Sequence, residues 1–236
     1  MNRNAFKVGI QRGLPVAMGY FSVSLGFGTL AANQGIGILQ TSVFSLTNFT
    51  SAGQFAGVTL MVGGAGLWEV ILTQMVINSR YALMALALSQ RLGDRANFFQ
   101  RLLIAFFNSD EIFAIAMGEK LPLTPSFMLG LGILPLMGWV AGSFVGALAG
   151  SWLPPALSAA MGVMLYGMFI AILIPPALKE RPVCIAVILA AVLSGIFAWV
   201  PGVKEISSGL AIVICTVVVS AVCAALFPVS EEEEAA

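Results

Sequence analysis

The stretch TSAGQFAG, residues 50–57, decides how this chain is folded. It lies inside an apolar run, residues 39–62, that is long enough for a helix to cross a hydrocarbon core of about 30 Å. Glycine and small hydroxyl-bearing residues weaken a helix, and polar groups that face lipid are costly. The stretch therefore predicts a break in the helix at membrane depth.

The chain as a whole has the composition of an integral membrane protein. Of its 236 residues, 59% are hydrophobic and 9% are charged, and its mean hydropathy is +0.97. A soluble domain has about 25% charged residues. The period-2 alternation that is typical of membrane β-strands is absent, so the apolar runs are expected to be helices. We predict an all-α polytopic membrane protein.

Apolar segments follow one another along the whole chain. The connections between them are short and carry most of the prolines, glycines and charges, so we expect a single transporter domain over residues 1–236. The acidic end, residues 230–236, is expected to be a disordered tail. The apolar segments are 14–32, 39–62, 67–90, 102–117, 126–150, 156–174, 183–200 and 207–227.

Residue types that carry much of enzyme chemistry are missing. The chain has no histidine, which removes Ser-His catalysis, haem ligation by histidine and the usual zinc sites. Its three cysteines lie in apolar runs without CxxC spacing, and no GxxxxGK[ST] nucleotide motif occurs. The net charge is zero, with no basic patch for nucleic acid. We therefore expect no enzyme activity, no cofactor and no metal.

The loop charges indicate how the segments cross. Lys and Arg in short loops favour the cytoplasmic side. If every segment crosses, the basic loop 91–101 falls on the side opposite the basic N-terminus. If segment 39–62 enters and leaves on one side, that loop returns to the cytoplasm. If segment 102–117 does the same, Lys120 and the basic pair in 179–181 also become cytoplasmic.

With both segments broken, Lys204 is the one loop cation left outside, Arg80 being counted on neither side. This distribution predicts about six full transmembrane helices plus two broken or re-entrant segments, 39–62 and 102–117, with a cytoplasmic N-terminus. The alternative is seven or eight full spans. Paired interruptions of this kind indicate the binding site of a transporter.

Ionisable residues inside the apolar segments need partners, because a charge at the bilayer centre costs at least about 2.5 kcal/mol. Arg80 lies near the middle of segment 67–90, and Asp110 and Glu111 are the acids at comparable depth. We predict an ion pair between Arg80 and one of these two acids. Glu69, two residues into its segment, lies either at the membrane interface or in the site.

The order Asn108-Ser109-Asp110-Glu111 predicts the start of a half-helix. Ser and Asn are good N-caps, and acids in the first turn interact favourably with the helix dipole. A proton-coupled carrier needs a carboxyl group that takes up and releases a proton while buried. Asp110 and Glu111 are candidates for that role, and a static ion pair is the alternative.

A glycine stripe runs along segment 126–150. Glycines at every fourth position form a smooth face that allows a second helix to approach closely. The sequence leaves open whether that second helix belongs to this chain or to another subunit. The glycines are Gly138, Gly142, Gly146 and Gly150.

At these residues the chain resembles the AzlC family, the large subunit of branched-chain amino acid exporters. The matching stretches are GLPVAMGYFSVSLGFGTLA (13–31), FTSAGQFAGVTLMVGGAG (49–66), VINSRYALMALAL (76–88) and NSDEIFAIA (108–116). The resemblance covers roughly the first half of the chain, and the second half is similar only in hydropathy and in its glycine and proline rhythm. Residues 50–54 depart from the family's usual Ala-Gly-Ala-Ser-Gln, and Asn108-Ser109 replaces its usual Thr.

The resemblance implies a secondary transporter that exports leucine, isoleucine and valine, with methionine as a further candidate, from the bacterial cytoplasm across the inner membrane. It also implies a small AzlD-type membrane partner. Such a carrier would use alternating access driven by the proton gradient or the membrane potential. A channel-like facilitator for a small zwitterionic or polar solute is the alternative.

An amino acid substrate needs donors for its carboxylate, acceptors for its ammonium group and an apolar pocket. A half-helix that begins near residues 51–54 would supply backbone donors. Asp110, Glu111 or exposed carbonyl groups would supply the acceptors. We predict that the substrate site is lined by Ser51, Gly53, Gln54, Phe55 and Asn78.

Overall fold

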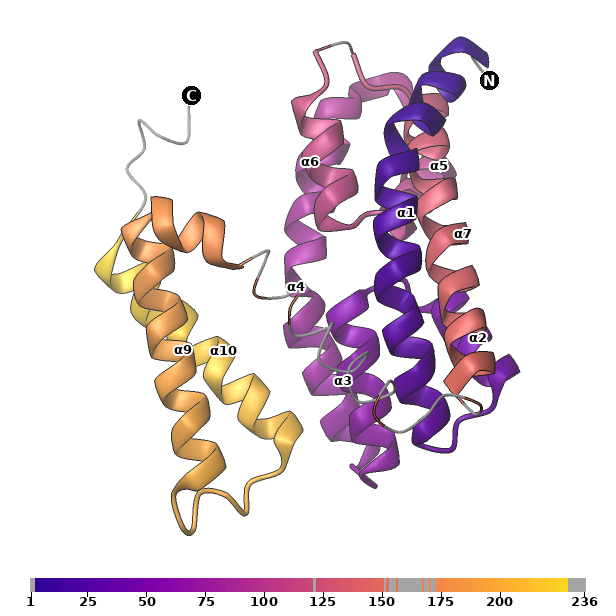
Figure 1. The fold of residues 1–236 in the computed structure, drawn as a ribbon. Helices are drawn as coiled ribbons and strands as arrows, with labels where there is room; N and C mark the ends of the chain where they lie inside the picture. Colours follow the sequence, from indigo (N-terminus) through magenta and orange to yellow (C-terminus); the bar gives the residue numbers. More distant parts are fainter. Residues whose placement is uncertain are drawn as a thin grey trace. The chain divides into compact units, whose positions relative to one another are not determined.

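A computed structural model describes residues 3–120, 122–150, 152, 156, 167, 170 and 173–228 (Figure 1). Over these residues the chain is helical and contains no strand, which confirms the all-α prediction. The predicted tail 230–236 and most of segment 156–174 lie outside the described residues. The helices are α1 (Arg3–Asn33), α2 (Ile38–Thr47), α3 (Ser51–Val62), α4 (Leu67–Leu92), α5 (Phe98–Phe106), α6 (Asp110–Gly118), α7 (Pro125–Gly150), α9 (Arg181–Trp199) and α10 (Ser208–Leu226), with a 3-10 helix, η1, at Gly93–Arg95.

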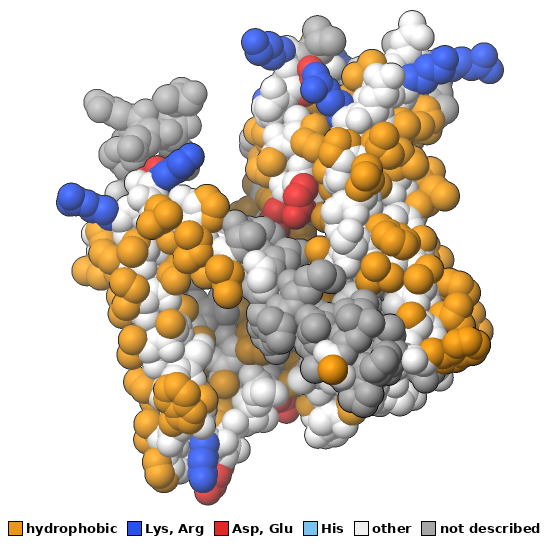
Figure 2. All heavy atoms as spheres, in the orientation of Figure 1, with side chains coloured by type: hydrophobic (Ala, Val, Ile, Leu, Met, Phe, Trp, Pro, Cys, Tyr) orange, Lys and Arg blue, Asp and Glu red, His pale blue; other side chains and the backbone are white. Residues whose placement is uncertain are grey.

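Five of the described helices are long and apolar enough to cross a membrane: α1, α4 with η1, α7, α9 and α10. The helices α2, α3, α5 and α6 are too short to cross by themselves. Figure 2 shows hydrophobic side chains over much of the visible surface, with Lys and Arg gathered at the ends of the helices. This pattern is typical of a polytopic membrane protein.

The chain divides into two compact units. One unit comprises residues 1–55 and 78–165, and the other comprises residues 56–77 and 166–236. The first unit holds α1, α2, α5, α6 and α7 with parts of α3 and α4, and it contains the interrupted segments. The single domain expected over residues 1–236 stays a prediction.

The helices α1 and α7 lie side by side along most of their length and form the core of the first unit (Figure 1). A Cβ added at Gly138 would collide with the carbonyl oxygen of Ala17, and one added at Gly146 would collide with that of Leu25. From the other side, a Cβ at Gly28 would collide with the carbonyl oxygen of Ser143. The glycine stripe of α7 therefore packs within this chain, against α1.

Gly146→Leu should destabilise the first unit, because the new side chain would force α1 and α7 apart. Overpacking of a tight contact costs about 1–3 kcal/mol. The measurement is thermal unfolding of the purified protein in detergent. Gly19→Leu is the matched control. Gly19 lies in α1, and a Cβ added there has no atom within 4 Å. Equal melting temperatures for the two variants would contradict the packing role.

The segment that holds α5 and α6 is a hairpin. The α5 helix begins shortly after α4 ends, and the chain returns to the same end of α4 when α6 finishes. There the guanidinium group of Arg91 donates to the carbonyl oxygen of Met117 over 2.7 Å and to that of Glu119. The predicted broken segment 102–117 thus enters and leaves at one end of the unit, with its break at residues 107–109.

The helices α2 and α3 form the second hairpin. The rings of Phe44 and Phe55, one on each arm, both contact Phe27 of α1, with ring centroids 6.3 and 5.0 Å apart respectively. Across the hairpin the amide of Gln54 donates to the hydroxyl of Ser45 over 2.6 Å. The predicted broken segment 39–62 therefore folds back on itself.

The break in this hairpin lies at the N-terminal edge of the stretch 50–57. The break lies at residues 48–50, and α3 runs without interruption from Ser51 through Gly53. The hydroxyl of Thr50 donates to the side-chain oxygen of Asn48 over 2.6 Å, and such local bonds compete with helix formation. The small residues after Thr50 form the first turn of the new helix, so the half-helix begins at Ser51, within the predicted range 51–54, and Gly53 lies inside it.

The two hairpins approach from opposite ends of the first unit (Figure 1). The α2–α3 hairpin follows the C-terminal end of α1. The end of α6 lies instead near the start of α1, where Gln11 and Arg12 border one cavity together with Gly118 and Glu119. The order of a long helix followed by a broken hairpin is therefore repeated in the opposite direction, an arrangement known from secondary transporters.

In the second unit, α9 packs against α10. The carboxylate of Glu69 accepts a hydrogen bond of 3.1 Å from the backbone N–H of Gly209, in the first turn of α10. Ser207 caps the same turn by accepting from the N–H of Leu210. An acid is favourable at a helix N-terminus, so the contact gives Glu69 a role in holding α10.

Candidate functional site

The candidate site lies where the two hairpin tips meet inside the first unit. A small pocket of about 10 Å³ is enclosed there, about the space of one water molecule. It is lined by side chains from α1, α4, α6, α7 and the start of α3: Tyr20, Phe49, Ser51, Tyr81, Ser109, Asp110, Glu111 and Trp139. The break in each hairpin is what brings polar groups to this depth.

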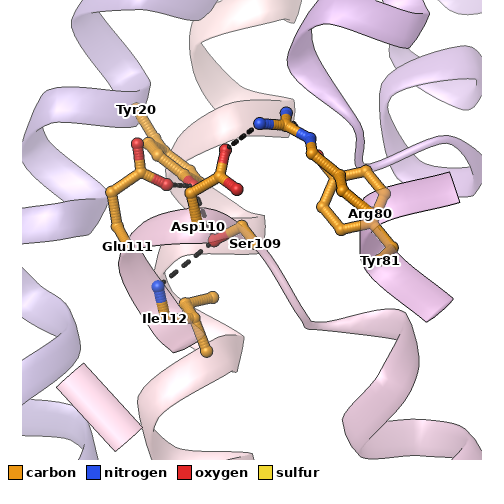
Figure 3. Close-up of polar contacts among 7 residues, drawn as sticks. All are labelled: Tyr20, Arg80, Tyr81, Ser109, Asp110, Glu111 and Ile112. Carbon is orange, nitrogen blue, oxygen red and sulfur yellow. Dashed lines mark hydrogen bonds and ion pairs between the residues drawn. The ribbon is translucent and has the colours of Figure 1, made fainter. Parts of the chain in front are cut away.

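Ser109 begins the polar edge of the pocket. It is the N-cap of α6, and its hydroxyl accepts from the backbone N–H of Ile112 over 3.3 Å (Figure 3). Asp110 and Glu111 follow in the first turn, where the helix dipole favours acids. The half-helix predicted from Asn108-Ser109-Asp110-Glu111 is present.

Arg80 of α4 faces Asp110 (Figure 3). The guanidinium Nη1 lies 2.7 Å from the Asp110 Oδ2, and the guanidinium carbon lies 5.1 Å from the centre of the Tyr81 ring. The ring face attracts the cation as well. The structure thus pairs Arg80 with Asp110, which neutralises both charges.

Removing one partner of this pair should cost more than removing both. An unpaired charge at membrane depth costs about 2.5–3.5 kcal/mol on insertion scales. The cost here should be smaller, since the side chains of Arg80 and Asp110 are 45% and 40% exposed in the isolated chain. We expect Arg80→Gln to lower the yield and the melting temperature of the folded protein, and Arg80→Gln with Asp110→Asn to recover part of the loss.

Thermal unfolding in detergent of the two single variants and the double variant tests this expectation. Additive losses in the double variant would contradict the coupling between the two residues.

Glu111 has a different neighbour. The hydroxyl of Tyr20, on α1, contacts the carboxylate Oε2 of Glu111 and lies 2.7 Å from the hydroxyl of Ser109 (Figure 3). Among the described residues no cation pairs with Glu111; the ion pair at this site joins Arg80 to Asp110. Glu111 therefore carries a carboxyl group whose charge has no direct counter-ion in the structure.

Gln54 lies in a buried network. Its carbonyl oxygen accepts from the indole N–H of Trp139 over 2.7 Å, and its amide donates to Ser45. The hydroxyl of Ser45 in turn donates to that of Ser143 over 2.7 Å. Gln54, Ser45 and Ser143 are fully buried, so this network fixes the α2–α3 hairpin to α7.

The predicted substrate residues are placed as follows. Ser51 lines the pocket. Gly53, Gln54 and Phe55 are buried in helix packing and do not line it, and Asn78 is not among the lining residues. Of the predicted ionisable residues, Asp110 and Glu111 line the pocket and Arg80 reaches it through Asp110.

An aromatic cluster was not predicted from the sequence. The ring centroid of Tyr20 lies 5.6 Å from that of Phe49 and 5.5 Å from that of Trp139, each in an edge-to-face arrangement. The one available signal was a hydroxyl-bearing aromatic residue, Tyr20, in the middle of an apolar run. The rings of this cluster line the same pocket as Asp110 and Glu111.

Asn108 is a further residue of interest at the α5–α6 break. Its side chain is 3% exposed, and neither its amide nor its carbonyl group has a hydrogen-bond partner. No group of three potential metal ligands occurs among the described residues.

Replacing Gln54 with leucine should destabilise the protein, because the indole N–H of Trp139 would be left buried without an acceptor. Each buried unsatisfied group costs about 1–3 kcal/mol. Thermal unfolding measured by tryptophan fluorescence reports the loss. Gln90→Leu is the matched control, since Gln90 is exposed on α4. A melting temperature for Gln54→Leu as high as that of the control would refute the structural role of the network.

Comparison with known proteins gives consistent matches. The family model described as AzlC protein matches residues 15–153. The inner membrane protein YgaZ of Escherichia coli (strain K12) is 29% identical over 81% of this chain and 81% of its own length. An uncharacterized membrane protein of Archaeoglobus fulgidus is 31% identical over 77% of this chain and 80% of its own.

The branched-chain amino acid transport protein AzlC of Bacillus subtilis (strain 168) is 20% identical over 75% of this chain and 70% of its own length. No solved structure matches the chain significantly.

Proposed function

The chain belongs to the AzlC family, and from this premise and the geometry of the site we propose that it is a secondary transporter for branched-chain amino acids. It exports leucine, isoleucine or valine, with methionine as a further substrate, across the cytoplasmic membrane. The N-terminus faces the cytoplasm, and a small AzlD-type membrane subunit assists. The observation that carries the proposal is the meeting of two oppositely directed broken hairpins at one polar pocket.

The chemistry of the pocket suits an amino acid. The carboxylates of Asp110 and Glu111 are acceptors for an ammonium group, and Ser51 offers a hydroxyl. The start of α3 is a helix N-terminus, whose dipole favours a carboxylate. Phe49 and Trp139 supply the apolar wall that a branched side chain needs.

The pocket is too small for an amino acid in the conformation described. Binding therefore requires the hairpin tips to move apart. Carriers move in this way when one repeat rocks or opens against the other around a central site. A channel would instead keep a continuous pore, so the closed pocket favours a carrier over the alternative, a channel-like facilitator.

Counterflow in proteoliposomes tests the proposal. Vesicles that contain the protein, with and without the small subunit, are loaded with unlabelled leucine and placed in labelled leucine. We expect transient uptake of label that isoleucine and valine suppress and that glutamate and lysine do not. Absence of counterflow under every gradient would overturn the proposal, and uptake at channel-like rates without counterflow would favour the facilitator.

Ser51→Leu tests whether the pocket itself binds the substrate. The larger side chain fills the space between the hairpin tips, so counterflow should fall about tenfold or more. Ser22→Leu is the matched control, because Ser22 is exposed on α1 and its hydroxyl bonds only to its own helix, at Met18. Equal counterflow by the two variants would place the substrate elsewhere.

A further inference from the structure

Resting on this proposed function, we propose that Glu111 is the proton-binding residue of the transport cycle and that Tyr20 and Ser109 hold it in both of its protonation states. Asp110, its neighbour in sequence, serves instead as the fixed counter-ion of Arg80. The different roles of the two acids follow from three observations: the contacts that each acid makes, the ability of the Tyr20 hydroxyl both to donate and to accept a hydrogen bond, and an open cavity beside α6.

The charges around the pocket do not balance. Arg80 contributes one positive charge, and Asp110 at 2.7 Å offsets it. The other polar groups that line the pocket with Glu111 are neutral hydroxyls, those of Tyr20, Ser51, Tyr81 and Ser109. α7 contributes Trp139, which carries no charge. A lone carboxylate at membrane depth is costly, so Glu111 has reason to bind a proton.

The hydroxyl of Tyr20 has one hydrogen but two neighbours that accept, Glu111 and Ser109. When Glu111 is ionised, Tyr20 donates to the carboxylate and Ser109 donates to Tyr20. When Glu111 is protonated, its own O–H donates to Tyr20, and Tyr20 donates to Ser109. Both arrangements use the same heavy-atom positions, so a proton can bind and leave while the hydrogen bonds of Tyr20 with Glu111 and with Ser109 are kept.

Asp110 lacks partners that can bond to both of its protonation states. Its carboxylate oxygen is engaged by the guanidinium group of Arg80, which donates and never accepts. Protonation of Asp110 would leave Arg80 without its counter-ion. The ion pair therefore gives Asp110 a partner in its ionised form alone, whereas the hydroxyl groups around Glu111 can bond to either form of its carboxyl group.

An open cavity of about 560 Å³ lies between α1 and the C-terminal part of α6. Its lining includes Ile115, one helical turn beyond Glu111 on the same face of α6, and Pro15, one to two turns before Tyr20 on α1. Arg12, Glu119 and Lys120 border it at the end where α1 begins. This end is the side from which we expect protons to be exchanged.

Transport assays that separate proton coupling from substrate binding test the proposal. Glu111→Gln should lose accumulation driven by a pH gradient by about tenfold or more. Its counterflow, which needs no net proton movement, is measured alongside, and the loss of pH-driven accumulation should exceed any loss of counterflow. In the double variant Arg80→Gln with Asp110→Asn, accumulation driven by the pH gradient should fall no more than counterflow falls. Glu111→Gln that still accumulates leucine in response to pH, or a double variant that loses only the response, would overturn the proposal.

Infrared difference spectra between acid and alkaline buffer give a readout that does not depend on transport. Wild-type protein in detergent should show a carboxylic-acid carbonyl band that shifts in Tyr20→Phe, because the hydrogen bond from Glu111 is lost, and that is absent in Glu111→Gln. If the band were the same in Tyr20→Phe as in the wild type, the role of Tyr20 would be overturned. This result does not require the variant to transport leucine. If wild-type protein shows no leucine counterflow but shows this band, the transport proposal fails and the assignment of Glu111 stands.

Discussion

Backbone that leaves the helical conformation at membrane depth must be covered by protein, and this constraint governs the rest of the first unit. Each hairpin has one such interruption, at residues 48–50 and 107–109. Local side chains satisfy part of the exposed backbone, as Ser109 does at the start of α6. The close pair of α1 and α7 supplies the wall against which both interruptions lie, and glycines make that closeness possible.

The two hairpins are held in different ways. Gln54, with Ser45 and Trp139, fixes the α2–α3 hairpin to α7 through fully buried neutral hydrogen bonds. The α5–α6 hairpin meets its neighbours through charges and hydroxyls, and a cavity lies along its α6 arm. Neutral buried networks are rigid when every member is satisfied, whereas charged contacts beside a cavity change with protonation. The α5–α6 hairpin is therefore the arm to which we assign proton binding.

The broken segments could be predicted from the sequence because the signals for them lie in neighbouring residues or in the summed charges of the loops. Loop charges summed over short connections indicated which segments fold back, and Ser109 before two acids indicated a helix start. The orientation of the Gln54 side chain was not predictable, since it depends on a hydrogen bond from Trp139, which is 85 residues away. Likewise Tyr20 meets Glu111 across 91 residues, and no periodicity in either segment encodes that contact. Whether a residue on a given helix lines the pocket or packs between helices therefore depends on contacts with residues that are distant in the sequence.

The succession of two acids, Asp110 and Glu111, acquires a physical explanation from helix geometry. Neighbouring positions on a helix point about 100° apart, so adjacent acids at the start of α6 cannot face the same partner. One side chain reaches α4 and the other reaches α1, as the contacts of Arg80 and Tyr20 show. The helix dipole favours a negative charge at both positions, but a cation meets only the first. A single turn of helix thus presents one acid that pairs with a cation and one that contacts hydroxyl groups, and the role proposed for Glu111 rests on this difference.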